Sequence, residues 1–198
     1  MATPVYGVRM SANTKDRILD AARDLFVESG EAAVTMRAVA TAAGVSTMAA
    51  YRHFPNKEAL LVAVMEHGHD KFLACMSRAL SAPSPLERLI ASGQAFLDFA
   101  LANPRDYDLM FLRTAQVDLT CAPLAWRDAA TFRFLVDRVS ECMSAGYLQG
   151  EDPEMLAFSI WSLVHGMVAL YLTAKLATDE ATFRGLYVRA LTAALARS

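Results

Sequence analysis

Apolar residues recur along most of the chain at intervals of three and four residues, the spacing that places side chains on one face of an α-helix. Asn13 or Thr14 can cap the first such helix, and Gly30 can end it. The apolar face of this helix consists of Ile18, Ala21, Ala22, Leu25 and Phe26. No stretch alternates apolar and polar residues over a useful strand length. The pattern therefore predicts an all-α chain of about nine helices.

Two short helices are expected next, one on each side of a turn. Thr35 caps the first helix, and Gly44 stops it. Ser46 caps the second, which runs to about Phe54 because Pro55 cannot continue a helix. A glycine suits the turn, since a helix-turn-helix bends sharply there and often needs a positive φ.

The rest of the chain continues as helices separated by prolines and glycines. Asn56 is the expected cap of a fourth helix, whose apolar side is Leu60, Leu61, Val64 and Met65. The composition changes at residues 81–85, where Ser84 and Pro85 mark a helix start. The remaining helices are expected at about residues 85–103, 104–111, 123–145, 153–177 and 179–196. Asp152 and Pro153 open the long apolar helix, and Thr178 or Asp179 caps the last one.

The composition is typical of a folded cytoplasmic protein. Hydrophobic residues make up 55% of the 198 and charged residues 20%, enough for a substantial core. The longest apolar candidate, residues 155–177, is interrupted by polar residues, and we expect no membrane span. The N-terminus lacks an apolar signal core. Three widely spaced cysteines, Cys75, Cys121 and Cys142, suit a reducing compartment better than disulfides or zinc.

Charge is distributed unevenly, although the formal net charge is only −2. From Ala32 to Lys57 there is no acidic residue, while Arg37, Arg52 and Lys57 are basic. A surface that approaches a polyanion is expected to lack carboxylates, because each would repel phosphate. A chance fluctuation over so short a stretch is the alternative. The helix-turn-helix is therefore a candidate for binding duplex DNA.

Each polar residue of this stretch has a plausible role on DNA. The second short helix would point its N-terminal turn into the major groove, where Thr47 and Met48 reach thymine methyls or base edges. Arg37 reaches a base edge or a phosphate. Arg52 faces solvent or pairs with a carboxylate of the first helix. The expected phosphate contacts are Thr35, Ser46, Tyr51, His53 and Lys57. If the stretch only stabilises the fold, four of its side chains would lie on the surface without a functional contact: Thr47, Met48, His53 and Lys57.

Residues 14–66 resemble the DNA-binding domain of TetR-type regulators. The matching positions are Ile18 to Ala22, Leu25, Phe26, Gly30, Thr35, Arg37 to Ala40, Ala43 to Ser46, Tyr51, His53, Phe54, Lys57 and Leu60. The resemblance implies a homodimer on a near-palindromic operator, with the last two helices of each subunit forming a four-helix bundle. Family members often carry glycine and a larger aliphatic residue where this chain has Ala49 and Ala50. The resulting slim helix leaves room for recognition of DNA shape.

The chain is accordingly divided into a disordered arm (residues 1–12), a three-helix DNA-binding domain (13–57) and a helical effector-binding and dimerisation domain (58–198). Trp161, His165 and Gly166 resemble the tryptophan–histidine–glycine signature of one effector-domain subgroup. Apolar, adaptable side chains suit a ligand pocket, but such stripes at helical spacing are more often core. The candidate ligand contacts are Phe96, Phe99, Met110, Phe111, Trp126, Trp161 and His165. His165 orients a polar group of the effector, bonds a backbone carbonyl, or faces the dimer partner.

The sequence predicts a repressor that a small hydrophobic effector releases from a palindromic operator. An activator of the same family and a helical ligand-binding protein without DNA function are the alternatives. The segment from Glu66 to Asp70 carries two histidines and two acids, but it indicates a solvated hinge rather than a metal site. The sequence contains no nucleophile motif, phosphate loop or carboxylate pair, so no enzyme activity, metal or cofactor is expected.

Overall fold

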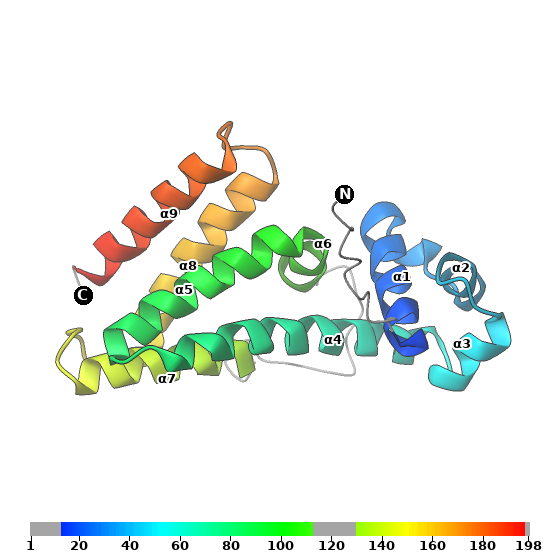
Figure 1. Ribbon diagram of the computed structural model, residues 1–198, viewed down its shortest axis with the longest axis horizontal. Helices are drawn as coiled ribbons and strands as arrows, with labels where there is room; N and C mark the ends of the chain where they lie inside the picture. The colour runs from blue at the N-terminus through cyan, green and yellow to red at the C-terminus, as the bar shows by residue number, and fades with distance from the viewer. Residues whose placement is uncertain (1–12, 113–129, 197–198) are drawn as a thin grey trace, which may run out of the picture. The chain divides into compact units, whose positions relative to one another are not determined.

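The computed structural model describes residues 13–112 and 130–196, and within these ranges the regular secondary structure is all helical, without a strand (Figure 1). The all-α prediction is thus confirmed, and the described residues contain nine α-helices, as expected. They are α1 Thr14–Ser29, α2 Met36–Ala42, α3 Thr47–His53, α4 Lys57–Ser77, α5 Pro85–Ala102, α6 Pro104–Tyr107, α7 Ala130–Ser144, α8 Pro153–Leu172 and α9 Glu180–Leu195. The expected arm at residues 1–12 and the expected start of the helix at 123 lie outside the described residues.

Side-chain caps begin most of these helices at the predicted residues. Asn13 caps α1, Thr35 caps α2, and Ser46 caps α3 through a 3.1 Å bond from the Ala49 amide to the Ser46 hydroxyl. The Asn56 side chain accepts the Ala59 amide of α4 at 2.8 Å. Each cap satisfies an amide that the first helical turn leaves unpaired, so the short-range sequence pattern is enough to place these ends.

Side-chain caps also place the helix starts in the second half of the chain. Ser84 and Glu87 form a capping box at the start of α5, where Pro85 occupies the first helical position. Asp152 caps α8, and Asp179 caps α9 through the Thr182 amide at 2.8 Å. Of the two caps proposed for the last helix, Asp179 is therefore the one used.

The chain separates into two compact units, Met1–His67 and Gly68–Ser198. The core of the first unit brings together apolar side chains of α1, α2 and α3 with the first turns of α4. Its fully buried members include Ile18, Phe26, Val39, Ala50 and Leu60. Gly30, which ends α1, has a φ of +78°, the left-handed conformation that only glycine adopts without strain.

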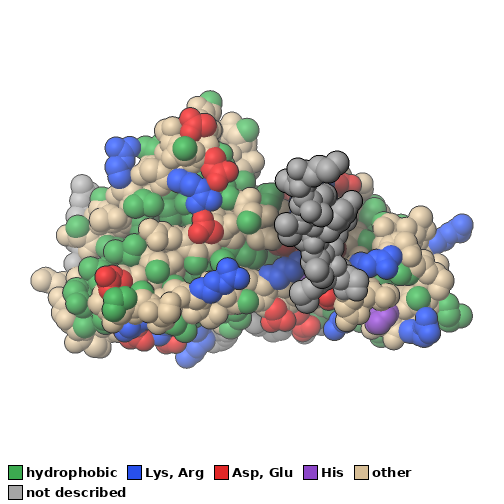
Figure 2. All heavy atoms as spheres, in the orientation of Figure 1, with side chains coloured by type: hydrophobic (Ala, Val, Ile, Leu, Met, Phe, Trp, Pro, Cys, Tyr) green, Lys and Arg blue, Asp and Glu red, His purple; other side chains and the backbone are tan. Residues whose placement is uncertain are grey.

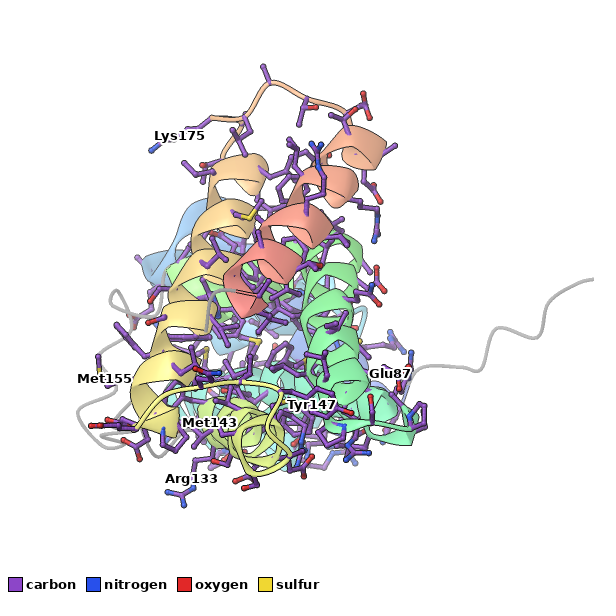
Figure 3. The ribbon with its side chains drawn as sticks, turned by 90° about the vertical axis from the view of Figure 1, so that its left-hand side faces the viewer. Glu87, Arg133, Met143, Tyr147, Met155 and Lys175 are labelled. Atoms are coloured by element: carbon purple, nitrogen blue, oxygen red, sulfur yellow. The ribbon has the colours of Figure 1, made fainter. Side chains whose placement is uncertain are left out.

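The second unit is built on the packing of α5, α7, α8 and α9, with α6 against α5 (Figure 3). Tyr171 and Phe183 stack with ring centroids 4.1 Å apart. The buried Tyr187 hydroxyl donates to the carbonyl oxygen of Gly93 at 2.8 Å, which fastens α9 to α5. A Cβ atom on Gly93 would overlap Leu191 of α9, so the close approach of these two helices requires glycine at this position.

Two expectations need correction. The eighth helix ends at Leu172 instead of about Ala177, because Ala174 turns to a φ of +54° and the Lys175 amide bonds back to the Leu170 carbonyl oxygen at 3.0 Å. The expected hinge at residues 66–70 is an uninterrupted part of α4. Gly68 is buried there, and a Cβ atom would lie 2.8 Å from the Met110 sulfur, so a close contact explains this glycine better than flexibility does.

Helix α8 is, by length and composition alone, apolar enough to cross a membrane. The polar residues within this helix do not lower its mean hydropathy enough to exclude a membrane span. The apolar side chains Met155, Phe158 and Leu170 are exposed along this helix, and Met155 points away from the neighbouring helices in Figure 3. A single helix of this kind is weak evidence for a membrane span. An exposed apolar face also marks surfaces that a protein partner covers.

Candidate nucleic-acid interface

The turn between α2 and α3 is held by a side chain from another helix. The Arg17 guanidinium of α1 donates to the carbonyl oxygen of Ala43 and, at 3.2 Å, to that of Gly44. Gly44 has a φ of +65°, and the Val45 amide bonds the Ala40 carbonyl oxygen at 2.9 Å. Sequence reasoning found Gly44 but missed Arg17, because no local pattern connects residues so far apart in the chain. These bonds fix the angle at which α3 leaves α2.

Helix α3 has one buried side and one exposed side. Ala50 is fully buried, whereas Met48 is 72% and Tyr51 50% exposed. Thr47 is half-buried, and Arg52 and His53 are exposed. Large apolar groups are costly to leave in water, so an exposed methionine and tyrosine on one short helix indicate a surface that another molecule covers.

The exposed side of α2 and α3 is basic. The side chains of Arg37, Arg52 and His53 have no hydrogen-bond or ion-pair partner among the described residues. Figure 2 shows Lys, Arg and His side chains over the region where Figure 1 places these helices. Arg52 thus faces solvent, which resolves the two alternatives left by the sequence. Thr35 and Ser46 are exposed too, although their hydroxyls already cap the helices.

Lys57 differs from the other expected phosphate contacts. Its ammonium donates to the carbonyl oxygen of Glu31 at 2.9 Å and lies 3.3 Å from the carboxylate of the same residue. The side chain is half-buried and ties the start of α4 to the 3₁₀ turn Glu31–Ala33. Two of its three N–H donors are therefore used inside the protein, which leaves one for a DNA phosphate.

A narrow cavity of about 40 Å³ lies inside the second unit. Its apolar wall includes Phe72, Met76, Leu89, Phe96, Ile160 and Leu191, and its polar wall is Ser92 and Thr131. The Ser92 hydroxyl is occupied, since it donates to the Arg88 carbonyl oxygen at 2.8 Å. None of the described residues that line the cavity carries a charge.

His165 lies directly behind this wall in a cluster of aromatic rings. Its ring centroid is 4.7 Å from those of Phe96 and Trp161, which both line the cavity, and 4.6 Å from that of Phe111. The Tyr107 hydroxyl lies 3.3 Å from Nδ1 of His165. Burial lowers the pKa of His165 to about 4, so the imidazole is neutral near pH 7.

The seven predicted ligand contacts lie at different positions relative to the cavity. Phe96 and Trp161 line the cavity, Phe111 and His165 lie behind it, and Phe99 and Met110 are buried in the surrounding core. Trp126 lies outside the described residues. Sequence reasoning missed Tyr107, which is fully buried, because its partner His165 lies on a distant segment.

Comparison with known proteins finds two family models that match this chain. Residues 18–64 match the model described as bacterial regulatory proteins, tetR family, and residues 89–194 match a tetracyclin repressor-like C-terminal domain. The second match alone covers more than half of the chain. The tryptophan–histidine–glycine subgroup expected from Trp161, His165 and Gly166 is not confirmed.

Curated relatives carry names of transcriptional regulators. The regulator RutR of Escherichia coli is 30% identical over 153 residues, which cover 75% of this chain and 70% of RutR. The transcriptional activator FasR of Mycolicibacterium smegmatis is 34% identical over 98 residues, 49% of this chain. That match spans 45% of the length of FasR, less than half of this relative.

Solved structures share the fold. A tetR-family regulatory protein from Rhodococcus RHA1 has a TM-score of 0.74 at 24% identity and covers 93% of this chain and 96% of its own. The fatty acid degradation regulator FadR from Bacillus halodurans has a TM-score of 0.77 at 20% identity and covers 92% and 94%. At these identities the likeness concerns the architecture alone.

Proposed function

The chain belongs to the TetR family of bacterial regulatory proteins and is a DNA-binding transcriptional regulator, and from this premise we propose that it is a homodimeric repressor released from a palindromic operator by a small hydrophobic effector. The exposed side of α3 carries this proposal. While Ala50 on the opposite side is fully buried, Met48 and Tyr51 project from this exposed side, in a stretch without a carboxylate. Because such a regulator acts on the chromosome, we place it in the cytoplasm.

The DNA contacts follow from exposure and chemistry. Thr47 and Met48, at the start of α3, reach base edges in the major groove, and Arg37 reaches a base edge or a phosphate. Tyr51 and His53 contact phosphate oxygens, as do the exposed hydroxyls of Thr35 and Ser46. Lys57 supports this surface through Glu31 and offers its remaining donor to the flanking backbone.

We propose that dimerisation uses the exposed sides of α8 and α9. Phe158, Leu170 and Leu186 are exposed apolar residues on these helices. A Cβ atom on Gly166 or Gly185 would meet nothing within 4 Å, so both positions present backbone to an approaching partner. Two long helices from each subunit can bury about 1,600 Å², the area of a standard stable interface.

The cavity of the second unit is the proposed effector site. Phe72 and Met76 of α4 line it, and α4 begins at Lys57, directly after α3 in the chain. An effector that occupies the cavity and moves α4 would change the spacing of the two recognition helices, about 34–36 Å on an operator. A coupling free energy of about 1–3 kcal/mol is enough to release DNA.

An activator is the second candidate, favoured by the name of FasR, a transcriptional activator that matches about half of this chain. Both candidates predict the same DNA-binding surface. A transcription assay, and not a DNA-binding assay, therefore distinguishes a repressor from an activator. In a reporter assay with the upstream promoter, deletion of the gene raises expression for a repressor and lowers it for an activator.

The DNA-binding proposal is tested by fluorescence anisotropy with a duplex from upstream of the gene that encodes this chain. We expect specific binding of two chains per operator and an affinity that falls steeply with salt. Failure of the purified chain to bind this duplex in dilute salt, at concentrations where it is dimeric, would overturn it. Sedimentation at the same concentrations measures the dimer independently.

A further inference from the structure

Arg17 of α1 caps the C-terminal end of a different helix. The last carbonyl groups of an α-helix carry partial negative charge, and no amide of their own helix bonds them. At the end of α2 the Arg17 guanidinium donates to two carbonyl oxygens, those of Ala43 and Gly44, and Nη2 is the donor in both bonds. A cation is stabilising at this end of a helix. The contact therefore closes α2 with a side chain that the turn itself does not supply.

The Arg17 side chain starts from a rigid base. The next two residues of α1, Ile18 and Leu19, are buried in the core of the first unit. The Arg17 amide bonds the Asn13 carbonyl oxygen at 3.1 Å, within the capped first turn of the helix. Helix α1 also packs against α2 (Figure 1). The guanidinium thus ties the turn after α2 to a backbone that is itself fixed by the core.

The start of α3 depends on this turn for its orientation. The helix has seven residues, of which Ala50 is the buried one, and the buried Phe54 anchors its far end. At the near end, Val45 and Ser46 are the two residues that separate Gly44 from α3. So short a connection transmits a shift of the turn directly to the first residues of the helix. The first turn of α3 is also the part proposed to face base edges.

Arg17 differs from the other arginine of α1. Arg23 is joined to the carboxylates of Asp20 and Asp24, each at 2.9 Å. Arg17 forms no ion pair within the described ranges, so no carboxylate draws its guanidinium away from the turn. The two residues share a side-chain type and a helix but not their partners, which makes Arg23 a matched control for Arg17.

We propose that Arg17 is a positioning residue for operator recognition: it orients the start of α3 through the carbonyl groups of Ala43 and Gly44, and it acts through α3 instead of through a DNA phosphate. This inference rests on the proposed use of α3 as the recognition helix. Without the contact, Thr47 and Met48 remain on the helix but are misdirected in the major groove. Operator binding then becomes weaker and base preference becomes less strict.

The test compares Arg17→Met with Arg23→Met in anisotropy titrations with the upstream duplex at several salt concentrations. Arg17→Met should weaken binding about ten-fold, the factor of a charge-assisted hydrogen bond. Its salt slope should equal that of Arg23→Met, because each variant loses one cation and neither loses a phosphate contact. Arg23→Met should keep the affinity of the unaltered chain. A slope smaller by about 1 in Arg17→Met alone would mean that Arg17 binds a phosphate, and it would overturn the proposal.

Base preference separates positioning from a role in stability alone. Competition with duplexes that carry single base-pair changes should show smaller penalties in Arg17→Met than in the unaltered chain. The measurement uses a temperature at which circular dichroism shows the variants folded, since lower stability alone does not alter the base preference of folded chains. If Arg17→Met does not fold, Arg17→Lys takes its place. It keeps the charge without the planar group, and it should show the same changes at smaller size.

Unaltered affinity and base preference in the folded variant would overturn the inference. Failure of the unaltered chain to bind the duplex contradicts the proposed function instead. Specific binding by the unaltered chain together with equal binding by Arg17→Met contradicts the positioning role alone.

Discussion

The hydroxyl of Tyr107 lies 3.3 Å from Nδ1 of His165 and 3.3 Å from the carbonyl oxygen of the same residue. The tyrosine belongs to α6 and the histidine to α8, so this pair joins a four-residue helix to a long one. Tyr107 is fully buried, and burial raises its pKa well above the ordinary value. The hydroxyl therefore stays protonated and acts as a fixed partner of the neutral imidazole.

Tyr107→Phe should lower the free energy of unfolding by about 1–3 kcal/mol, because it leaves a buried imidazole nitrogen without its partner while preserving the ring. Urea denaturation followed by circular dichroism measures the change. Tyr147→Phe is the matched control, since Tyr147 is exposed and should change stability by less than about 0.5 kcal/mol. Equal effects of the two changes would show that the Tyr107 hydroxyl contributes nothing.

His165 should make stability depend on pH. Its pKa is about 4 in the folded protein and about 6.5 when exposed in the unfolded chain. The unfolded state therefore binds more protons between these values, so stability is constant above about pH 6.5 and falls as the pH approaches 4. The loss is on the order of 3 kcal/mol.

The measurement is the urea midpoint from pH 4.5 to 7.5 for the unaltered chain and for His165→Phe. The variant should have the shallower slope. His69 contributes in the same direction, since burial lowers its pKa too, and His69→Asn estimates that part. An unchanged slope in His165→Phe would contradict burial of a neutral histidine at this position.

Much of the fold could be predicted from the sequence because its signals are local. A cap, a proline or a glycine acts within one helical turn, so Thr35, Ser46, Ser84 and Asp152 marked helix starts correctly. The end of α8 was misplaced because apolar residues continue beyond Leu172, and hydrophobicity alone does not reveal the turn at Ala174.

The candidate sites were harder to predict because side chains from distant segments complete them. The exposed side of α3 could be anticipated, since its residues lie within one helix-turn-helix. Arg17 was missed, as were Tyr107 and the bond from Lys57 to Glu31, because each joins residues at least 26 positions apart. A helical stripe shows which residues point inward, but not which of them line a cavity.

Gly44→Ala should destabilise the first unit and weaken binding to every DNA sequence. Its φ of +65° is unfavourable for alanine, and the new Cβ atom would lie 3.0 Å from the Arg17 guanidinium that holds the turn. We expect a loss of about 1–3 kcal/mol in thermal or urea unfolding. Gly146→Ala is the matched control, since it has a φ of +76° but nothing within 4 Å. A smaller loss at Gly44 than at Gly146 would contradict the role of the Arg17 contact.

Arg37 and Lys57 should respond differently to substitution. Arg37→Ala removes an exposed cation without an internal partner, so it should weaken operator binding and reduce the salt slope by about 1 if it contacts a phosphate. Lys57→Ala should change the salt slope less and lower stability, because its ammonium is held by Glu31. Anisotropy titrations at several salt concentrations separate these effects. A larger slope change for Lys57→Ala would mean that it leaves Glu31 for the DNA.

Thr47→Ala should change sequence preference more than overall affinity, because the side chain lies at the start of α3, the position proposed here to read base edges. Competition between the natural operator and duplexes with single base-pair changes measures preference, with a cost of about 1–3 kcal/mol per important base pair. Thr41→Ala is a suitable control, since that exposed hydroxyl on α2 bonds the Arg37 carbonyl oxygen inside its own helix. Identical base preferences in the unaltered chain and Thr47→Ala would exclude direct reading by Thr47.

Leu170→Arg should disrupt the dimer and, with it, binding to the palindromic operator. The leucine is exposed on α8, and burying an unpaired guanidinium in an apolar interface costs several kcal/mol. Leu80→Arg provides the control, because Leu80 is equally exposed at 44% but lies in the short 3₁₀ turn Arg78–Ser81, away from α8 and α9 in the chain. Sedimentation measures the mass, and anisotropy with a half-site and a full site measures the loss of paired binding. If Leu170→Arg remains dimeric while Leu80→Arg dissociates, the interface lies elsewhere on the second unit.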